Sequence, residues 1–155
     1  MRVEVPGHGE YDLRFLVLDY NGTLAVDGRM EEETRQKLQS LASFYTIFVL
    51  SADTFGTVRE QCLDLPLAVE VAPALDGAVF KENFVRNLGA EHVAAIGNGF
   101  NDRLMLQTAR LGIVVLGGEA CSREALLAAD LVAPEVNQAL DLLLNPARLV
   151  ASLRG

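Results

Sequence analysis

The stretch FLVLDYNGTL, residues 15–24, decides both the fold and the place of the functional site. Its first four residues are all apolar, which is typical of a strand that is buried on both faces of a sheet. The apolar run stops at Asp19 and passes into Asn21, Gly22 and Thr23, which are residue types common in turns. The stretch therefore predicts a core strand that ends at Asp19, with polar groups at its carboxyl end.

On both sides of this strand, strand and helix patterns alternate along the chain with short connections. Residues 3–5 and 11–17, joined by PGHG, predict an N-terminal β-hairpin that feeds the core strand. We expect further strands at 46–50, 67–71, 93–96, 112–116 and 131–133, and helices at 31–42, 54–63, 76–88, 101–109, 123–129 and, last, 134–144. Strands that alternate with helices predict a mostly parallel sheet with helices on both faces, the doubly wound α/β arrangement.

Composition indicates one globular domain. The chain has 155 residues, of which 50% are hydrophobic and 22% charged, and this balance favours a folded protein over a disordered one. We find no internal repeat or linker and expect a single domain over residues 1–155. The net charge of −8 disfavours nucleic acid or an anionic membrane as a partner. No signal-peptide pattern is present and no apolar run approaches the ~20 residues of a membrane span, so we expect a cytoplasmic protein.

Polar residues recur at the carboxyl ends of the predicted strands, where open parallel sheets bind ligands. Besides Asp19, they include Ser51 and the segment GNGFND at 97–102, while Lys81 lies early in the helix before that segment. Each has a purely structural interpretation: a turn for DYNGT, a cap of the next helix for Ser51, a solvated surface for Lys81, and a helix N-terminus for Asp102. Their occurrence in order on successive units favours a shared site.

These segments resemble the motifs of the haloacid dehalogenase superfamily. DYNGTL is similar to the first motif, DxDGT, and GNGFND to the fourth, GDGxND, while Ser51 and Lys81 resemble the single residues of the second and third. The chain looks most like the small phosphatases related to the phosphorylation domain of P-type ATPases. This resemblance implies a Mg²⁺-dependent phosphohydrolase whose substrate is a phosphorylated small molecule or a phosphoprotein.

The resemblance also implies roles for individual residues. Asp19 would be the nucleophile that accepts the phosphoryl group, and also a ligand of Mg²⁺. The remaining metal ligands would be the backbone carbonyl of Asn21, Asn98, and Asp102 directly or through water.

The phosphoryl oxygens would be held by a second set of groups, which stabilise charge in the transition state. In the resemblance this set consists of Lys81, Ser51 with its neighbour Ala52, and backbone N–H groups near Gly22.

Two residues depart from the family pattern. Asn21 stands where most family phosphatases have an Asp that acts as general acid and base, and an amide has no proton to exchange near neutral pH. Such a group typically contributes about 10²–10⁴-fold to the rate. Asn98 stands where the family has a metal-ligating Asp, so it brings no charge to the metal. The chain is therefore either a phosphatase that favours good leaving groups or a catalytically weak relative that binds phosphate and metal. Asp53 is close to the predicted site and would be either a further carboxylate of the site or a helix cap.

The spacing of the motifs leaves no room for a cap domain. Asp19 and Ser51 are 32 positions apart (51 − 19) and Ser51 and Lys81 are 30 apart (81 − 51), and the predicted helices and strands fill both gaps. An open site suits a large substrate or a pocket completed by another subunit. A homo-oligomer is therefore possible, although the apolar segment 142–149 suits packing within the domain.

Other functional classes fit the sequence less well. A receiver-like signalling domain needs an acidic pair before the acceptor Asp, and residues 1–18 offer none at a strand end. A dinucleotide site is disfavoured because GNGFND lacks the third glycine and follows the fourth strand. His8 and His92 lie in a turn and ahead of a strand, and Gly117-Gly118 suits either a turn or a close approach to a ligand.

Overall fold

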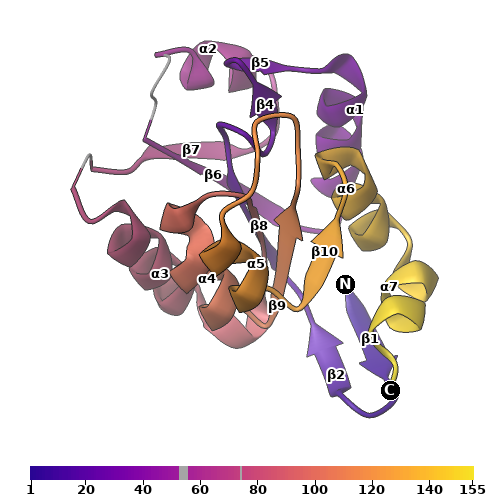
Figure 1. Cartoon of the computed structure of the whole chain (residues 1–155). Helices are drawn as coiled ribbons and strands as arrows, with labels where there is room; N and C mark the ends of the chain where they lie inside the picture. The colour runs from indigo at the N-terminus through magenta and orange to yellow at the C-terminus, as the bar shows by residue number, and fades with distance from the viewer. Residues whose placement is uncertain (53–55, 74) are drawn as a thin grey trace.

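A six-stranded parallel sheet forms the centre of the computed structural model, which describes residues 1–52, 56–73 and 75–155 (Figure 1). The strand order is β10-β9-β8-β3-β6-β7. The strands are β3 (Phe15–Asp19), β6 (Thr46–Ser51), β7 (Ala68–Val71), β8 (Val93–Gly97), β9 (Leu111–Val115) and β10 (Leu131–Ala133). The prediction of a doubly wound parallel sheet is confirmed.

Helices cover both faces of this sheet and create two separate hydrophobic cores. One face carries α1 (Glu32–Leu41), α2 (Val58–Cys62), α6 (Val136–Leu144) and α7 (Pro146–Leu153); the other carries α3 (Gly77–Leu88), α4 (Arg103–Thr108) and α5 (Arg123–Ala128). Strand β3 serves both cores, because successive side chains point to opposite faces. Leu16 and Leu18 pack into the first core and Val17 into the second. This is why FLVL has no polar interruption.

The predicted N-terminal hairpin is present, as the antiparallel pair β1 (Arg2–Val5) and β2 (Gly9–Asp12). The second strand ends at Asp12 and does not run on into β3, contrary to the expected range 11–17. The Arg110 guanidinium lies 3.7 Å from the ring centroid of Tyr11, which fastens the hairpin to the β9 end of the core.

Several other boundaries differ from the expected ones. A short hairpin, β4 (Ala25–Val26) and β5 (Arg29–Met30), follows the DYNGT turn and was not predicted. Single turns of 3₁₀ helix, η1 (Ala90–His92) and η2 (Phe100–Asp102), precede β8 and α4.

The helical C-terminus is longer than expected. The helix expected to be the last, 134–144, begins instead at Val136, and α7 follows it because Pro146 begins a new helix rather than continuing the old one. Leu143 and Leu149 are buried, so the apolar segment 142–149 packs within the domain as expected. In the described part of the chain, no helix combines the length and the apolar composition that a membrane span requires.

The chain reverses its direction of winding at β3. From β3 it passes to β6 and β7 on one side, then crosses to β8, β9 and β10 on the other. Parallel strands on both sides of such a reversal leave a crevice at their carboxyl ends. Asp19 ends β3 at this crevice, between the ends of β6 and β8.

Candidate functional site

The carboxyl edge of the sheet gathers buried polar side chains from four parts of the chain. Asp19 ends β3, Ser51 ends β6, Asn98 follows β8, and Asp102 ends η2. All four are less than a tenth exposed. Buried polar and charged groups are costly unless they are paired, so this concentration makes the edge the candidate functional site of the fold.

Lys81 joins two of these carboxylates. The lysine lies near the start of α3 and is fully buried, and its Nζ is 2.6 Å from Oδ1 of Asp19 and 2.6 Å from Oδ1 of Asp102. The solvated surface position considered for Lys81 is thus wrong. The three charges form one buried ion cluster with a net charge of −1, which we call the Lys81 cluster.

Burial and mutual charge set the ionisation of this cluster. Burial, together with the charge of Asp102, raises the pKa of Asp19 to about 6, although Lys81 opposes the rise. Burial favours the neutral amine of Lys81, yet the charges of Asp19 and Asp102 outweigh it and raise its pKa above the ordinary value. The lysine is therefore a fixed positive charge beside the Asp19 carboxylate.

Asp102 also binds backbone groups at the start of η2, in line with its structural interpretation. Its Oδ2 accepts hydrogen bonds from the backbone N–H groups of Asn98 (3.0 Å) and Gly99 (2.8 Å), which fixes the turn after β8. Gly97 allows this arrangement, because a Cβ there would lie 2.6 Å from Cγ of Asp102. GNGFND thus orients the carboxylate that holds Lys81.

Thr23 connects Asp19, at the end of β3, with Asn98, which follows β8. It was not predicted as a site residue. Its buried hydroxyl is 3.2 Å from Oδ2 of Asp19 and 3.0 Å from Oδ1 of Asn98. Asn98 is fixed in turn, because its Nδ2 donates to the carbonyl of Ala120 at 2.8 Å. One hydroxyl proton cannot serve both acceptors, so two oxygens converge there with a single donor between them.

Three further predicted residues, Gly22, Ser51 and Ala52, lie at the same edge of the sheet. Gly22 has a φ of +78°, and a Cβ there would be 2.3 Å from Nδ2 of Asn98, so only glycine fits between the DYNGT turn and β8. Ser51 is fully buried one residue beyond the partner of Asp19 in β6, whereas Ala52 is exposed. Asp53 lies outside the described residues. The capping role considered for Ser51 is wrong, because α2 begins only at Val58 with Thr57 before it.

Asn21 has a buried amide oxygen without a hydrogen-bond partner among the described residues. An unpaired buried oxygen carries a desolvation cost of about 1–3 kcal/mol, and such groups are found where a ligand or ion completes the site. By contrast, His92 binds the backbone carbonyl of Asp12 at 2.9 Å, at the opposite end of β8. It is no part of this edge.

The oxygens present suit a hard divalent cation. Oxygen donors are the ligands Mg²⁺ prefers, and it needs only one or two carboxylates. Within the described residues, no three acidic, histidine or cysteine side chains cluster closely enough to hold a metal by themselves. A cation would therefore rely on the converging oxygens of Asp19 and Asn98 and on backbone carbonyls.

Comparison with known proteins gives two relatives by sequence and many by structure. No model of a known protein family matches the chain. It is 50% identical over 62 residues to the uncharacterized protein MJ0073 of Methanocaldococcus jannaschii, a match that spans 40% of this chain and 67% of that one.

The structural relatives are phosphatases and hydrolases at low sequence identity. The 3-deoxy-D-manno-octulosonate 8-phosphate phosphatase of Moraxella catarrhalis, solved with magnesium, phosphate and the sugar acid, has a TM-score of 0.70 at 17% identity over 93% of this chain and 95% of that one. The cobalt-bound enzyme of Haemophilus influenzae gives 0.71 at 18% identity over 86% and 88%. A haloacid dehalogenase-like hydrolase of Bacteroides thetaiotaomicron gives 0.60 at 13% over 83% and 98%. The chain thus has the haloacid dehalogenase-type fold and belongs to one family with MJ0073.

Proposed function

We propose that this chain is a phosphatase that transfers the phosphoryl group of a phosphate monoester to Asp19 and then to water. The observation that carries the proposal is the Lys81 cluster: a buried lysine 2.6 Å from the Asp19 carboxylate, at the switch point of the sheet. A structural salt bridge of this depth contributes little net stability, so a role in chemistry is the better reason for its presence.

The reaction follows from the positions of these charges. A carboxylate oxygen of Asp19 attacks phosphorus, the bond to the leaving-group oxygen breaks, and an aspartyl-phosphate forms. Water then attacks the same phosphorus, which releases phosphate and restores the carboxylate. Lys81 would offset negative charge that gathers near Asp19 in both steps. Ser51 and the backbone near Gly22 and Ala52 would hold phosphoryl oxygens.

We assign to Mg²⁺ the oxygens of Asp19 and Asn98 and the backbone carbonyl of Asn21. Asp102 would act through water, because both of its oxygens already accept hydrogen bonds. When bound, the ion would neutralise charge on the phosphoryl oxygens. Asn98 replaces a carboxylate by an amide, so this chain should hold Mg²⁺ more weakly than a site with three carboxylates.

A catalytically weak relative that binds a phosphorylated ligand is the second candidate function. The observation that favours it is Asn21, whose amide cannot protonate a leaving group. With the acid missing, the proposed phosphatase should work best on esters whose leaving group departs as a stable anion, such as aryl phosphates.

The test is hydrolysis of p-nitrophenyl phosphate with and without Mg²⁺. We expect Mg²⁺-dependent turnover that Asp19→Asn lowers by at least about 10³-fold. Asn21→Asp should raise turnover by about 10–10²-fold, because it supplies the missing acid and base.

Gln36→Glu, an exposed change on α1, is the control for added charge and should leave turnover unaltered. Absence of turnover in the native chain across pH and divalent metals, together with binding of inorganic phosphate, would establish the second candidate instead.

A further inference from the structure

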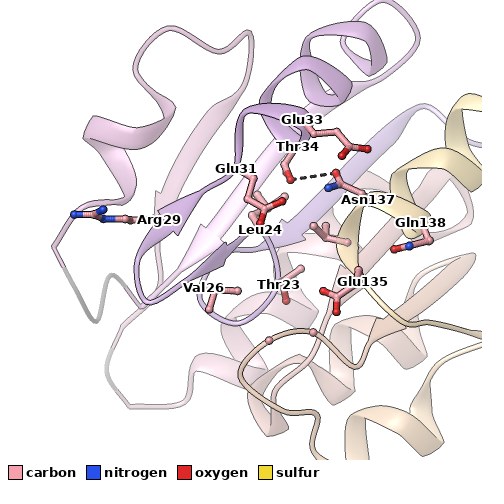
Figure 2. A pocket seen from close by; sticks show the side chains of 13 residues that line it. Thr23, Leu24, Val26, Arg29, Glu31, Glu33, Thr34, Glu135, Asn137 and Gln138 are labelled. Atoms are coloured by element: carbon pink, nitrogen blue, oxygen red, sulfur yellow. Dashed lines mark hydrogen bonds between the residues drawn. The ribbon is translucent and has the colours of Figure 1, made fainter.

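A cavity of about 570 Å³ opens beside the candidate site, on the face of the sheet that α1 and α6 cover (Figure 2). Its walls come from the DYNGT turn with the β4–β5 hairpin, the start of α1, the loop after β9, and the start of α6. Residues that matter for its chemistry are Thr23, Glu31, Glu33, Gly117, Glu135 and Asn137. Its volume is in the range of small-molecule sites.

Two contacts connect this cavity to the candidate site. Thr23 lines the cavity, and its hydroxyl is 3.2 Å from Oδ2 of Asp19. Gly117 forms another part of the wall, and a Cβ on it would lie 2.7 Å from the carbonyl oxygen of Gly22, so this wall touches the turn proposed to hold the phosphoryl group. A ligand can therefore occupy the cavity while its phosphate is at Asp19.

The charge of the cavity is negative. Glu33 is paired with Lys37, whose Nζ lies 2.9 Å from its Oε1. Glu31 and Glu135 have no ion pair within the described ranges. Arg29 also borders the cavity, but Figure 2 shows its side chain directed away from the other labelled residues. Two free carboxylates thus face the space with no cation opposite them.

Both free carboxylates belong to residues at the start of a helix and yet do not cap it. Glu31 precedes α1 and Glu135 precedes α6, and neither side chain accepts a hydrogen bond from its own helix. Each helix start supplies partial positive charge of roughly +0.5 and free N–H donors, which leaves the two full carboxylate charges in excess. The cavity therefore offers donors suited to hydroxyl oxygens and acceptors suited to an ammonium group.

Polar contacts deeper in the cavity keep this lining in place. The Thr34 hydroxyl donates to Oδ1 of Asn137 at 3.1 Å, which joins the start of α1 to the start of α6. The two glutamates are consequently presented from helices that are held at a fixed separation.

We propose that this cavity binds the leaving group of the substrate and selects phosphate monoesters of hydroxylated compounds that carry an ammonium group. The inference rests on the proposed phosphatase function. A leaving group with a second anionic charge is disfavoured, because Glu31 and Glu135 would repel it.

The experiment compares three sugar phosphates of similar size that differ in charge: glucosamine 6-phosphate with its amine protonated, glucose 6-phosphate, and 6-phosphogluconate. We expect kcat/KM to fall in that order, by roughly tenfold from the first to the second. In the Glu31→Gln/Glu135→Gln double variant, the ratio of the first two should fall to about one, since the carboxylates that distinguish them are gone. Glu4→Gln, the same change on the distant N-terminal hairpin, should keep the native ratio.

The possible results separate the two proposals. Turnover of p-nitrophenyl phosphate with equal kcat/KM for the three sugar phosphates overturns the inference and leaves the phosphatase intact. If no ester is hydrolysed, the phosphatase proposal fails, and the cavity is tested by titrating glucosamine and glucose while following the backbone amide signals of Gly117 and Gly118. Shifts with glucosamine alone, lost in the double variant, support the ligand chemistry; no shifts with either sugar overturn it.

Discussion

The chain has two lysines, and each is paired with two carboxylates in a different setting. Lys37 lies on α1, with Nζ 2.9 Å from Glu33 and 2.8 Å from Asp141, and these carboxylates remain 63% and 33% exposed. Lys81 makes shorter contacts to Asp19 and Asp102, whose side chains are 8% and 0% exposed. Each lysine thus has two carboxylate partners, but those of Lys37 are exposed to solvent and those of Lys81 are buried.

This difference in burial distinguishes an ion pair that only holds helices together from one that can take part in a reaction. Water screens the Lys37 pairs, so they contribute at most about 1 kcal/mol each. The Glu33 pair lies within α1, and the Asp141 pair joins α1 to α6. Lys81 and its two partners are almost completely buried, so solvent screens their charges far less, and the pKa values of Asp19 and Lys81 are both raised. Only the second arrangement can direct strong charge at a reacting group.

Replacement of each lysine in turn should give the largest difference between the two settings. Lys81→Met should lower kcat/KM for p-nitrophenyl phosphate by about 10²–10³-fold and the free energy of unfolding by about 3–5 kcal/mol, because it leaves buried carboxylates without a cation. Lys37→Met should lower the free energy of unfolding by about 1 kcal/mol and leave kcat/KM close to native. Urea unfolding and steady-state kinetics of both variants give the answer; equal effects of the two changes would mean that burial does not distinguish them.

A change with a smaller expected effect adds a negative charge at Asn98, beside the Lys81 cluster. Asn98→Asp should lower the free energy of unfolding without metal by about 1–3 kcal/mol, because it sets a carboxylate against the Ala120 carbonyl that now accepts from the amide. The same change should tighten Mg²⁺ binding by roughly tenfold, so added Mg²⁺ should stabilise this variant more than the native chain.

Thermal unfolding across a Mg²⁺ titration measures both effects. Asn87→Asp adds the same charge on the exposed side of α3 and serves as the control. If the two variants respond alike to Mg²⁺, Asn98 is not beside the metal.

The smallest expected effect concerns backbone strain beside the buried cluster. Ala120, whose carbonyl holds Asn98, has a φ of +110°, a conformation that favours glycine. Ala120→Gly should therefore raise the free energy of unfolding, by up to about 1 kcal/mol. Ala147→Gly, on an exposed position of α7, should lower it by a similar amount. A loss of stability in Ala120→Gly would show that this loop is not strained.

Much of the fold could be predicted because its signals are local. The run FLVL marks a doubly buried strand by itself, and the positions of Ser51 and GNGFND at strand ends follow from similar runs. Pro146, which follows Asn145, is also a local signal for the start of α7. The β4–β5 hairpin could not be found this way, because strands of two residues show no alternation.

The details of the site depend instead on contacts between distant residues. Thr23 acquires its role only because Asn98, 75 positions away, is brought against it. The burial of Lys81 is equally non-local: a lysine early in a helix is ordinarily solvated, and only the junction of β3, α3 and η2 encloses this one. Thr23 nevertheless belongs to the first motif, DYNGT, so the motif itself is a sequence signal for its role.

The most direct test of the account is to identify the residue that carries the phosphoryl group. Acid-quenched reaction of the native chain with a ³²P-labelled aryl phosphate and Mg²⁺, followed by peptide mapping, should place an acid-stable, hydroxylamine-sensitive label on Asp19. The slow acid–base step imposed by Asn21 should make this species accumulate. Turnover that proceeds without any label on Asp19, or a label on a different residue, would contradict the account.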